Sequence, residues 1–189
     1  MNALVQLDVP QLAKLTVDDF VTLDRAGAFD RYGKTELLDG VVVYVNAQYA
    51  PHYKLKNKLY RRIADACDRL EPPLFAWSEG AIGIRPHNVP EPDIFVTTVE
   101  PEEDLIGTDA IRLVVEVAST TLSTDLGYKA RLYARAGLPE YWVADVSRRM
   151  IHQLWSPAVE TFEHRREVAF GEPLRAATID GLAIDTSRL

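Results

Sequence analysis

Residues 111–146 of this chain, IRLVVEVASTTLSTDLGYKARLYARAGLPEYWVADV, predict a strand, a helix and a second strand in succession. The first part, Ile111–Val117, is apolar and β-branched, which is typical of a buried strand, and residues 140–146 have the same character. Between them Asp125 is placed to cap a helix that runs from about Leu126 to Ala136 and stops at the glycine that follows. This order favours a sheet that is covered by helices.

The flanking sequence adds more strands and two more helices. Strands are expected at residues 36–40, 41–45, 92–96, 150–155 and 160–168, the first two joined as a hairpin by an Asp-Gly turn. One helix is expected to start at the capping residue Thr16, and another follows Pro51. The total is a mixed sheet with about three helices, an α/β or α+β fold. At about 150 residues per domain, the length favours a single domain over residues 1–189, with the first helix and the hairpin ahead of the core.

The helix after Pro51 has an apolar face and a basic face. Apolar residues recur at steps of three and four, and these are Leu55, Leu59, Ile63, Ala66 and Leu70. Basic residues occupy another face, and these are Lys54, Lys58, Arg61 and Arg62. The basic face is a candidate for contact with phosphate groups, although a charged outer face is also what an ordinary surface helix shows.

The composition is that of a folded, acidic protein. The chain has 28 acidic and 21 basic side chains, a formal net charge of −7, and 47% of its residues are hydrophobic. This balance excludes extensive disorder, which requires few apolar residues and a high net charge together. It also argues against binding of nucleic acid by overall charge, because phosphate binding needs local lysine and arginine.

Cysteine usage and hydropathy point to the cytoplasm. The single cysteine, Cys67, excludes an internal disulfide and a multi-cysteine zinc site. No apolar run approaches the roughly 18 residues that a membrane span needs, so no membrane partner is expected. Residues 1–10 show no basic cluster followed by an apolar stretch, so no signal peptide is expected.

Two acidic residues, Asp93 and Glu116, lie near the ends of strands that are otherwise apolar. If these strands are neighbours, the carboxylates converge, and at about 5 Å and an effective dielectric near 20 they repel by roughly 3 kcal/mol. A shared proton, a lysine or a divalent cation must then offset the repulsion. Oxygen ligands favour Mg²⁺ or Mn²⁺ over zinc. The alternative is that each acid simply ends its strand in water.

Three further residues are candidates for the same site. Lys129 lies in the first turns of the helix after the Glu116 strand and is placed to point back at the acids; alternatively, it forms an ordinary helix pair with Asp125. Glu36 is either a third carboxylate or an exposed strand residue. His52 either contacts a phosphate or assists proton transfer, or it merely starts its helix.

These motifs follow one another in a fixed order. They are ELLDG at 36–40, His52 before an amphipathic helix, Pro92-Asp93, VEVAS at 115–119, Lys129 with Tyr133, and GLPEYWVAD at 137–145. The set resembles the Uma-type family of restriction endonucleases, which belongs to the PD-(D/E)XK nuclease superfamily. The resemblance covers about Thr16 to Trp155, and the part from Pro92 to Asp145 is the most specific.

The resemblance implies an α/β restriction-endonuclease-like core, in which helices flank a central mixed β-sheet. It implies that Asp93 and Glu116 bind Mg²⁺ or Mn²⁺ and that Glu36 is a further acidic member of the catalytic site. The lysine of the superfamily usually lies two residues after the glutamate, where this chain has Ala118. In this family the lysine is displaced to the following helix, which matches Lys129.

The activity that the resemblance implies is metal-assisted hydrolysis of phosphodiester bonds in DNA, by an enzyme that is often a homodimer. Lys129 would position the attacking water and offset charge in the transition state. Contacts to nucleic acid would come from His52, Lys54, Lys58, Arg61 and Arg62. One alternative is a catalytically silent dimeric module on the same fold that binds nucleic acid or serves as an accessory. Another is a glycosidase with two carboxylates, which would be insensitive to EDTA.

Overall fold

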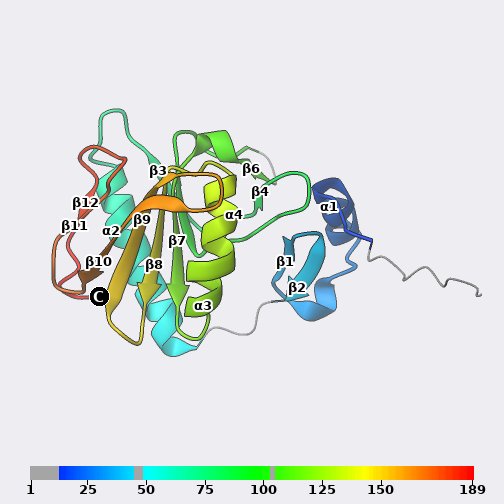
Figure 1. Ribbon diagram of the computed structural model, residues 1–189, viewed down its shortest axis with the longest axis horizontal. Helices are drawn as coiled ribbons and strands as arrows, with labels where there is room; N and C mark the ends of the chain where they lie inside the picture. Colours follow the sequence, from blue (N-terminus) through cyan, green and yellow to red (C-terminus); the bar gives the residue numbers. More distant parts are fainter. Residues whose placement is uncertain (1–12, 45–48, 103–104) are drawn as a thin grey trace, which may run out of the picture.

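The computed structural model of the protein describes residues 13–44, 49–102 and 105–189 (Figure 1). Its helices are α1 (Val17–Arg25), α2 (Ala50–Cys67), α3 (Leu122–Thr124) and α4 (Ala130–Arg135), with a π-helical turn at Asp125–Lys129 between the last two and 3₁₀ turns at Asp30–Tyr32 and Thr108–Ala110. Its strands are β1 (Thr35–Leu38), β2 (Val41–Tyr44), β3 (Phe75–Ser78), β4 (Ile82–Gly83), β5 (Ile94–Thr97), β6 (Ile106–Gly107), β7 (Ile111–Ala118), β8 (Glu140–Asp145), β9 (Met150–Pro157), β10 (Phe162–Ala169), β11 (Leu174–Arg175) and β12 (Ala183–Ile184).

A six-stranded sheet with the order β10-β9-β8-β7-β5-β3 forms the centre of the molecule. Within this sheet only β7 and β8 pair in parallel, and the chain crosses between them through α3, the π turn and α4. The other neighbours in this sheet are antiparallel, as short connections allow. The mixed sheet and the α/β class predicted from the sequence are therefore confirmed.

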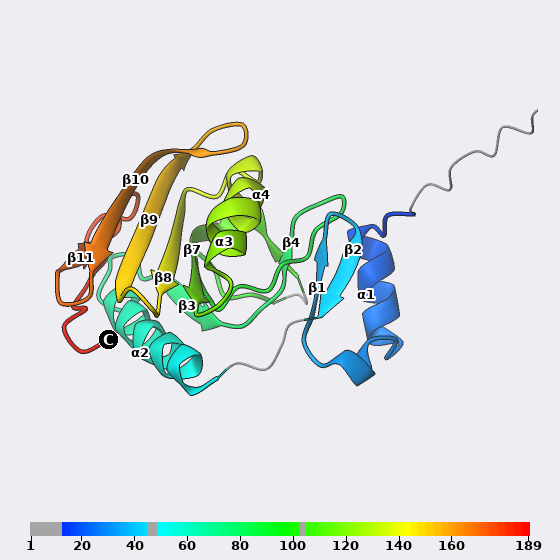
Figure 2. The same ribbon diagram turned by 60° about the horizontal axis from the view of Figure 1, so that its bottom comes forward.

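Helices cover both faces of the sheet, α2 on one side and α4 on the other (Figures 1 and 2). Side chains of β7 alternate between these two layers. Leu113, Val115 and Val117 pack in the cluster that includes the apolar stripe of α2, whereas Val114 packs in the cluster that includes α4. Glu116 follows the same alternation and so belongs to the α4 side of the sheet, at the end of a strand that is buried on both faces.

The N-terminal part forms a small module beside the sheet, in which α1 packs on the β1–β2 hairpin (Figure 2). The predicted hairpin is confirmed, with Asp39 and Gly40 at its turn, both at positive φ. Leu37 of β1 exchanges backbone hydrogen bonds with Val89 of the core, 3.1 and 2.8 Å long. This bridge fixes the hairpin against the core, and the residue that precedes Leu37, Glu36, lines the same cavity as Asp93 and Glu116.

The first helix begins as its sequence predicts. Thr16 is the N-cap, and Thr16 and Asp19 form a complete capping box. We expect Thr16→Ala to lower the free energy of unfolding by about 1 kcal/mol, because the amide of Asp19 loses its side-chain acceptor. Urea denaturation would measure this effect. Thr16→Ser, which keeps the hydroxyl, is the control, and equal stability of wild type and the alanine variant would contradict the prediction.

The helix after Glu116 starts earlier than the sequence analysis expected. Asp125 does not cap it: α3 begins at Leu122, and Asp125 is buried in the π turn, where its carboxylate accepts a 2.6 Å hydrogen bond from the Thr121 hydroxyl. The local sequence predicted the wrong start for this helix because Thr121 and Asp125 are both residue types that commonly precede a helix. π turns occur frequently at functional sites.

Short strands were also missed, because they depend on partners far along the chain. Strand β4 pairs in parallel with β6, which lies in the loop between β5 and β7, where the sequence analysis expected no strand. Ile106 of β6 is buried, so this part of the loop belongs to the core.

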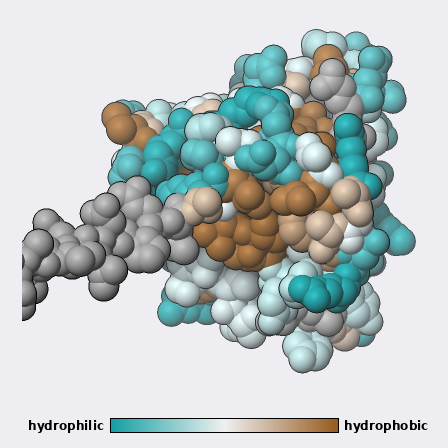
Figure 3. Space-filling view, turned by 90° about the vertical axis from the view of Figure 1, so that its right-hand side faces the viewer, coloured by the Kyte–Doolittle hydropathy of each residue, from teal (hydrophilic) through white to brown (hydrophobic). Residues whose placement is uncertain are grey.

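The face of the molecule that carries α1, β1 and β2 has an apolar patch (Figure 3). The exposed large aliphatic side chains of these elements are Leu23 and Val41, which are 38% and 53% accessible. Within the part of the chain that the structure describes, none of the helices is both long and apolar enough to cross a lipid bilayer.

Candidate active site

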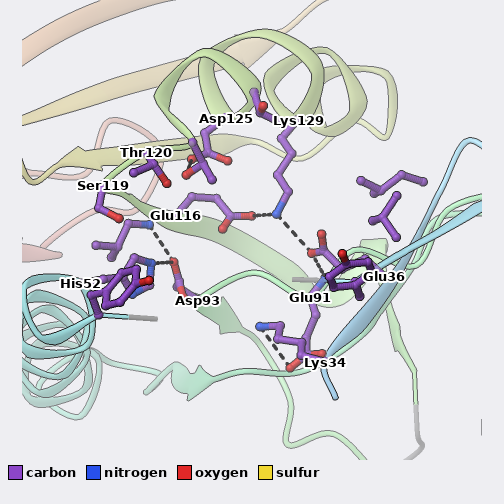
Figure 4. A pocket seen from close by; sticks show the side chains of 17 residues that line it. Lys34, Glu36, His52, Glu91, Asp93, Glu116, Ser119, Thr120, Asp125 and Lys129 are labelled. Atoms are coloured by element: carbon purple, nitrogen blue, oxygen red, sulfur yellow. Dashed lines mark hydrogen bonds and ion pairs between the residues drawn. The ribbon is translucent and has the colours of Figure 1, made fainter. Parts of the chain in front are cut away.

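A cavity of about 780 Å³ lies where the hairpin, the start of α2, the end of β7 and the π turn meet. Its walls include every acidic and cationic residue that the sequence analysis assigned to the catalytic site, which are Glu36, Asp93, Glu116 and Lys129, and also His52. Figure 4 shows these side chains around the cavity, and they come from β1, α2, the residue before β5, β7 and the π turn. The structure therefore brings together residues that are far apart in the sequence.

Asp93 and Glu116 lie opposite each other in the register of two neighbouring strands, near one end of each. The last backbone pair on this side of the β5–β7 ladder is Ile94 with Val115, so Asp93 and Glu116 stand one residue beyond it on opposite strands. The Val117 amide donates a 2.8 Å hydrogen bond to Asp93 Oδ2, which ties the aspartate to the neighbouring strand. Both side chains are almost fully buried, at 6% and 7% exposure.

Lys129 joins the acids of the sheet to the acid of the hairpin. Its ammonium donates to Glu116 Oε1 at 2.9 Å and to Glu36 Oε1 at 3.1 Å (Figure 4). Tyr133, one turn further along the same helix, also donates to Glu116 Oε1, at 3.1 Å. Lys129 thus points at the carboxylates, and Glu36 is buried rather than an exposed strand residue.

Asp93 has basic neighbours of its own, both supplied by α2. Nε2 of His52 lies 3.2 Å from Asp93 Oδ2, and Nζ of Lys56 lies 4.0 Å from Oδ1. Lys56 also forms a 2.5 Å ion pair with Glu79. His52 and Lys56 are four residues apart, so they share the face of α2 that is turned toward the site.

Burial dominates the electrostatics of this cluster. It would raise the pKa of Asp93, but the hydrogen bond and charge of His52 and the Val117 amide outweigh burial and hold that pKa below its usual range. Burial raises the pKa of Glu116, against the opposing charge of Lys129. For Lys129, burial would lower the pKa, but Glu116 and Glu36 overcome it and raise the pKa. The amine therefore stays charged, and Asp93 stays an anion.

The basic face of α2 does not belong to this cavity. Lys54, Lys58 and Arg61 are exposed along the helix, and none of them lines the cavity. Arg62 is partly buried and lies 3.6 Å from the carboxylate of Asp185 near the C-terminus. Among the basic residues predicted to contact nucleic acid, only His52 reaches the cavity.

Sequence reasoning missed one buried cation, Lys56. Its burial, at 6% exposure, is unusual for a lysine. The spacing of residues in α2 indicates which face Lys56 is on, because His52, Lys56 and Leu59 fall on one helical face with the apolar stripe. The sequence alone does not predict that a lysine on that face is buried, because lysines commonly lie at the surface.

The donor set suits a hard divalent cation such as Mg²⁺. Asp93 and Glu116 would hold it, because both carboxylates line the cavity from adjacent strands. No group of three or more His, Cys, Asp or Glu side chains in metal-binding geometry occurs within residues 13–44, 49–102 and 105–189. Mg²⁺ commonly binds through one or two carboxylates and completes its shell with water and substrate phosphate, so two acids fit this ion.

Comparisons with known proteins agree with this architecture. The Uma2 family model, described as "Putative restriction endonuclease", matches residues 17–187. The fold is similar to the crystal structure of a "putative nuclease belonging to DUF820" from Anabaena variabilis, with a TM-score of 0.59 and 13% identity over 85% of this chain and 88% of that one. Among the curated proteins, nothing matches this chain.

Proposed function

Because the chain belongs to the Uma2 family of putative restriction endonucleases, we propose that it is a metal-dependent nuclease that hydrolyses phosphodiester bonds in DNA. The observation that carries the proposal is the meeting of Asp93, Glu116 and Lys129 in one cavity, from two adjacent strands and the helix that follows them. Two carboxylates and a buried ammonium are the groups that this chemistry requires.

Each of these residues has a distinct role. Asp93 and Glu116 would hold Mg²⁺ or Mn²⁺, which polarises the scissile phosphate and lowers the pKa of a bound water. Lys129, fixed between Glu116 and Glu36, presents a permanent positive charge toward the cavity and stabilises negative charge that develops on the phosphate. His52 keeps Asp93 anionic and oriented through the contact at its Oδ2.

Nicking of supercoiled plasmid DNA tests this function. Wild-type protein with Mg²⁺ or Mn²⁺ is expected to convert the plasmid to open-circular and linear forms, and excess EDTA is expected to stop the reaction. Cleavage that continues in EDTA would contradict metal dependence and would favour a metal-independent hydrolase. A catalytically inactive variant purified in the same way controls for contaminating nucleases.

Loss of the Lys129 charge is expected to lower the cleavage rate. We expect Lys129→Met to reduce kcat by about 10²–10³-fold with a smaller effect on KM, because the ammonium acts mainly on charge that forms in the transition state. Lys129→Arg, which keeps the charge, should retain more activity than the methionine variant. Circular dichroism checks that both variants fold, and equal rates for all three proteins would contradict the role.

One observation favours a second candidate, a catalytically silent module that binds nucleic acid. The charge of Glu116 is already matched by the Lys129 ammonium at 2.9 Å, so the acidic cluster is partly compensated by the chain itself. A silent module predicts DNA binding without nicking at any metal concentration. A gel-shift assay beside the plasmid assay separates the two functions.

A further inference from the structure

Tyrosines that are exposed to solvent gather around the cavity. Four are more than two-fifths exposed, Tyr32 (42%), Tyr44 (62%), Tyr49 (79%) and Tyr53 (43%), and we call them the tyrosine platform. Tyr44 and Tyr49 line the cavity itself, on the side of the hairpin and at the N-cap of α2. The remaining tyrosines of the chain are less exposed, and Tyr133 and Tyr141 are fully buried. Exposed tyrosine is thus confined to residues 32–53, the stretch that contributes the hairpin and the start of α2 to the cavity.

Two rings of the tyrosine platform stack on each other, and a guanidinium lies over one of them. Tyr32 and Tyr44 stack at a centroid distance of 6.0 Å with an interplanar angle of 22°. The guanidinium of Arg31 lies over the Tyr32 ring, 4.6 Å from its centroid. Lys34 lines the cavity, and Lys54 is exposed beside Tyr53. A combination of aromatic faces and nearby cations is how proteins bind single-stranded nucleic acid, because every base can stack on a ring.

The depth of the reacting groups favours the same kind of substrate. The side chains of Asp93, Glu116 and Lys129 are only 6%, 7% and 11% exposed, so they lie recessed in the cavity. A flexible single strand can bend to bring a phosphate to such recessed groups, whereas a stiff duplex must be bent at a cost in free energy. The net charge of −7 also disfavours binding that relies on duplex phosphates alone.

From these observations we infer that the protein binds single-stranded DNA, with unpaired bases stacked on the tyrosine platform and the backbone led into the cavity. The inference rests on the proposed nuclease function and narrows its substrate class. Tyr44 and Tyr49 stand nearest the reaction and hold the bases that flank the scissile phosphate. Tyr32 and Tyr53 continue the binding surface away from the cavity.

Fluorescence anisotropy with a labelled twelve-nucleotide oligo-dT, in EDTA so that nothing is cleaved, tests the platform. Tyr44→Ala and Tyr49→Ala are each expected to weaken binding by about five- to hundredfold, the range that loss of one stacked base produces. Tyr44→Phe and Tyr49→Phe keep the ring and are expected to bind within about twofold of wild type. An abasic oligomer and a duplex of equal length are both expected to bind more weakly than oligo-dT.

Val159→Ala, at a residue that is 87% exposed and does not line the cavity, is the surface control and should not alter binding. Alanine variants that bind oligo-dT as wild type does, or an abasic oligomer that binds equally well, would overturn the inference. So would a failure of wild type to bind oligo-dT. If oligo-dT binding depends on the rings but neither plasmid nor single-stranded DNA is cleaved with Mg²⁺ or Mn²⁺, the proposed nuclease function fails and the inferred binding of single strands stands.

Discussion

Replacing Asp93 with asparagine is expected to abolish metal-dependent cleavage while leaving the fold intact. The asparagine is nearly isosteric and keeps an oxygen that can accept the 2.8 Å hydrogen bond from the Val117 amide. It removes the negative charge that would attract the cation. Metal catalysis supplies several kcal/mol of transition-state stabilisation, so we expect kcat/KM to fall by about 10³-fold or more.

Two measurements separate this effect from a general loss of structure. Calorimetric titration with Mn²⁺ should show weaker binding to Asp93→Asn than to wild type, and thermal melting should be little changed. Asp65→Asn, the same substitution at an exposed residue of α2, is the matched control and should cleave normally. If wild type cleaves and Asp93→Asn cleaves equally fast, the reaction takes place at another site.

Much of the central sheet could be predicted because its signals are local. The runs that became β5, β7 and β8 are apolar on both faces, and the stripe of α2 is periodic over several turns. The short strands could not be predicted in this way. A two-residue strand such as β4 exists only because β6 lies beside it, and neither has a pattern of its own.

The residues of the candidate site also differ in whether a local sequence pattern can predict them. Glu116 and Lys129 could be placed together from the sequence, because a strand–helix–strand unit returns the helix over the strand that it follows. Asp93 joins them only if β5 and β7 are neighbours, which no local pattern fixes. Lys56 could not be placed from the sequence, because its burial depends on Glu79 and Asp93, which come from other parts of the chain. A local pattern can identify the face on which a lysine lies, but the partner that keeps it buried is a property of the tertiary structure.

Glu140 shows how strongly one buried acid can support the structure outside the site. Its side chain is fully buried and accepts hydrogen bonds at 2.5–3.1 Å from donors on three segments. The donors are the Trp142 indole, the Gln153 amide, the backbone amides of Ala177 and Thr178 and the Thr178 hydroxyl. In the part of the chain that the structure describes, no lysine, arginine or histidine forms an ion pair with Glu140. Hydrogen bonds alone therefore compensate its burial and hold residues 177–178 against β8, an inner strand of the sheet.

We expect Glu140→Ala to lower the free energy of unfolding by about 3–5 kcal/mol, because several buried donors would lose their acceptor at once. The midpoint of urea denaturation should fall without a change in its slope, which would show a loss of stability rather than of compactness. Glu140→Gln keeps one acceptor oxygen and should cost less than the alanine variant. Glu163→Ala, at an exposed residue of β10, should stay within about 0.5 kcal/mol of wild type. A loss below about 1 kcal/mol for Glu140→Ala would mean that water replaces the carboxylate, and that the C-terminal segment is held instead by apolar contacts such as those of Ile179 and Leu182 with the core.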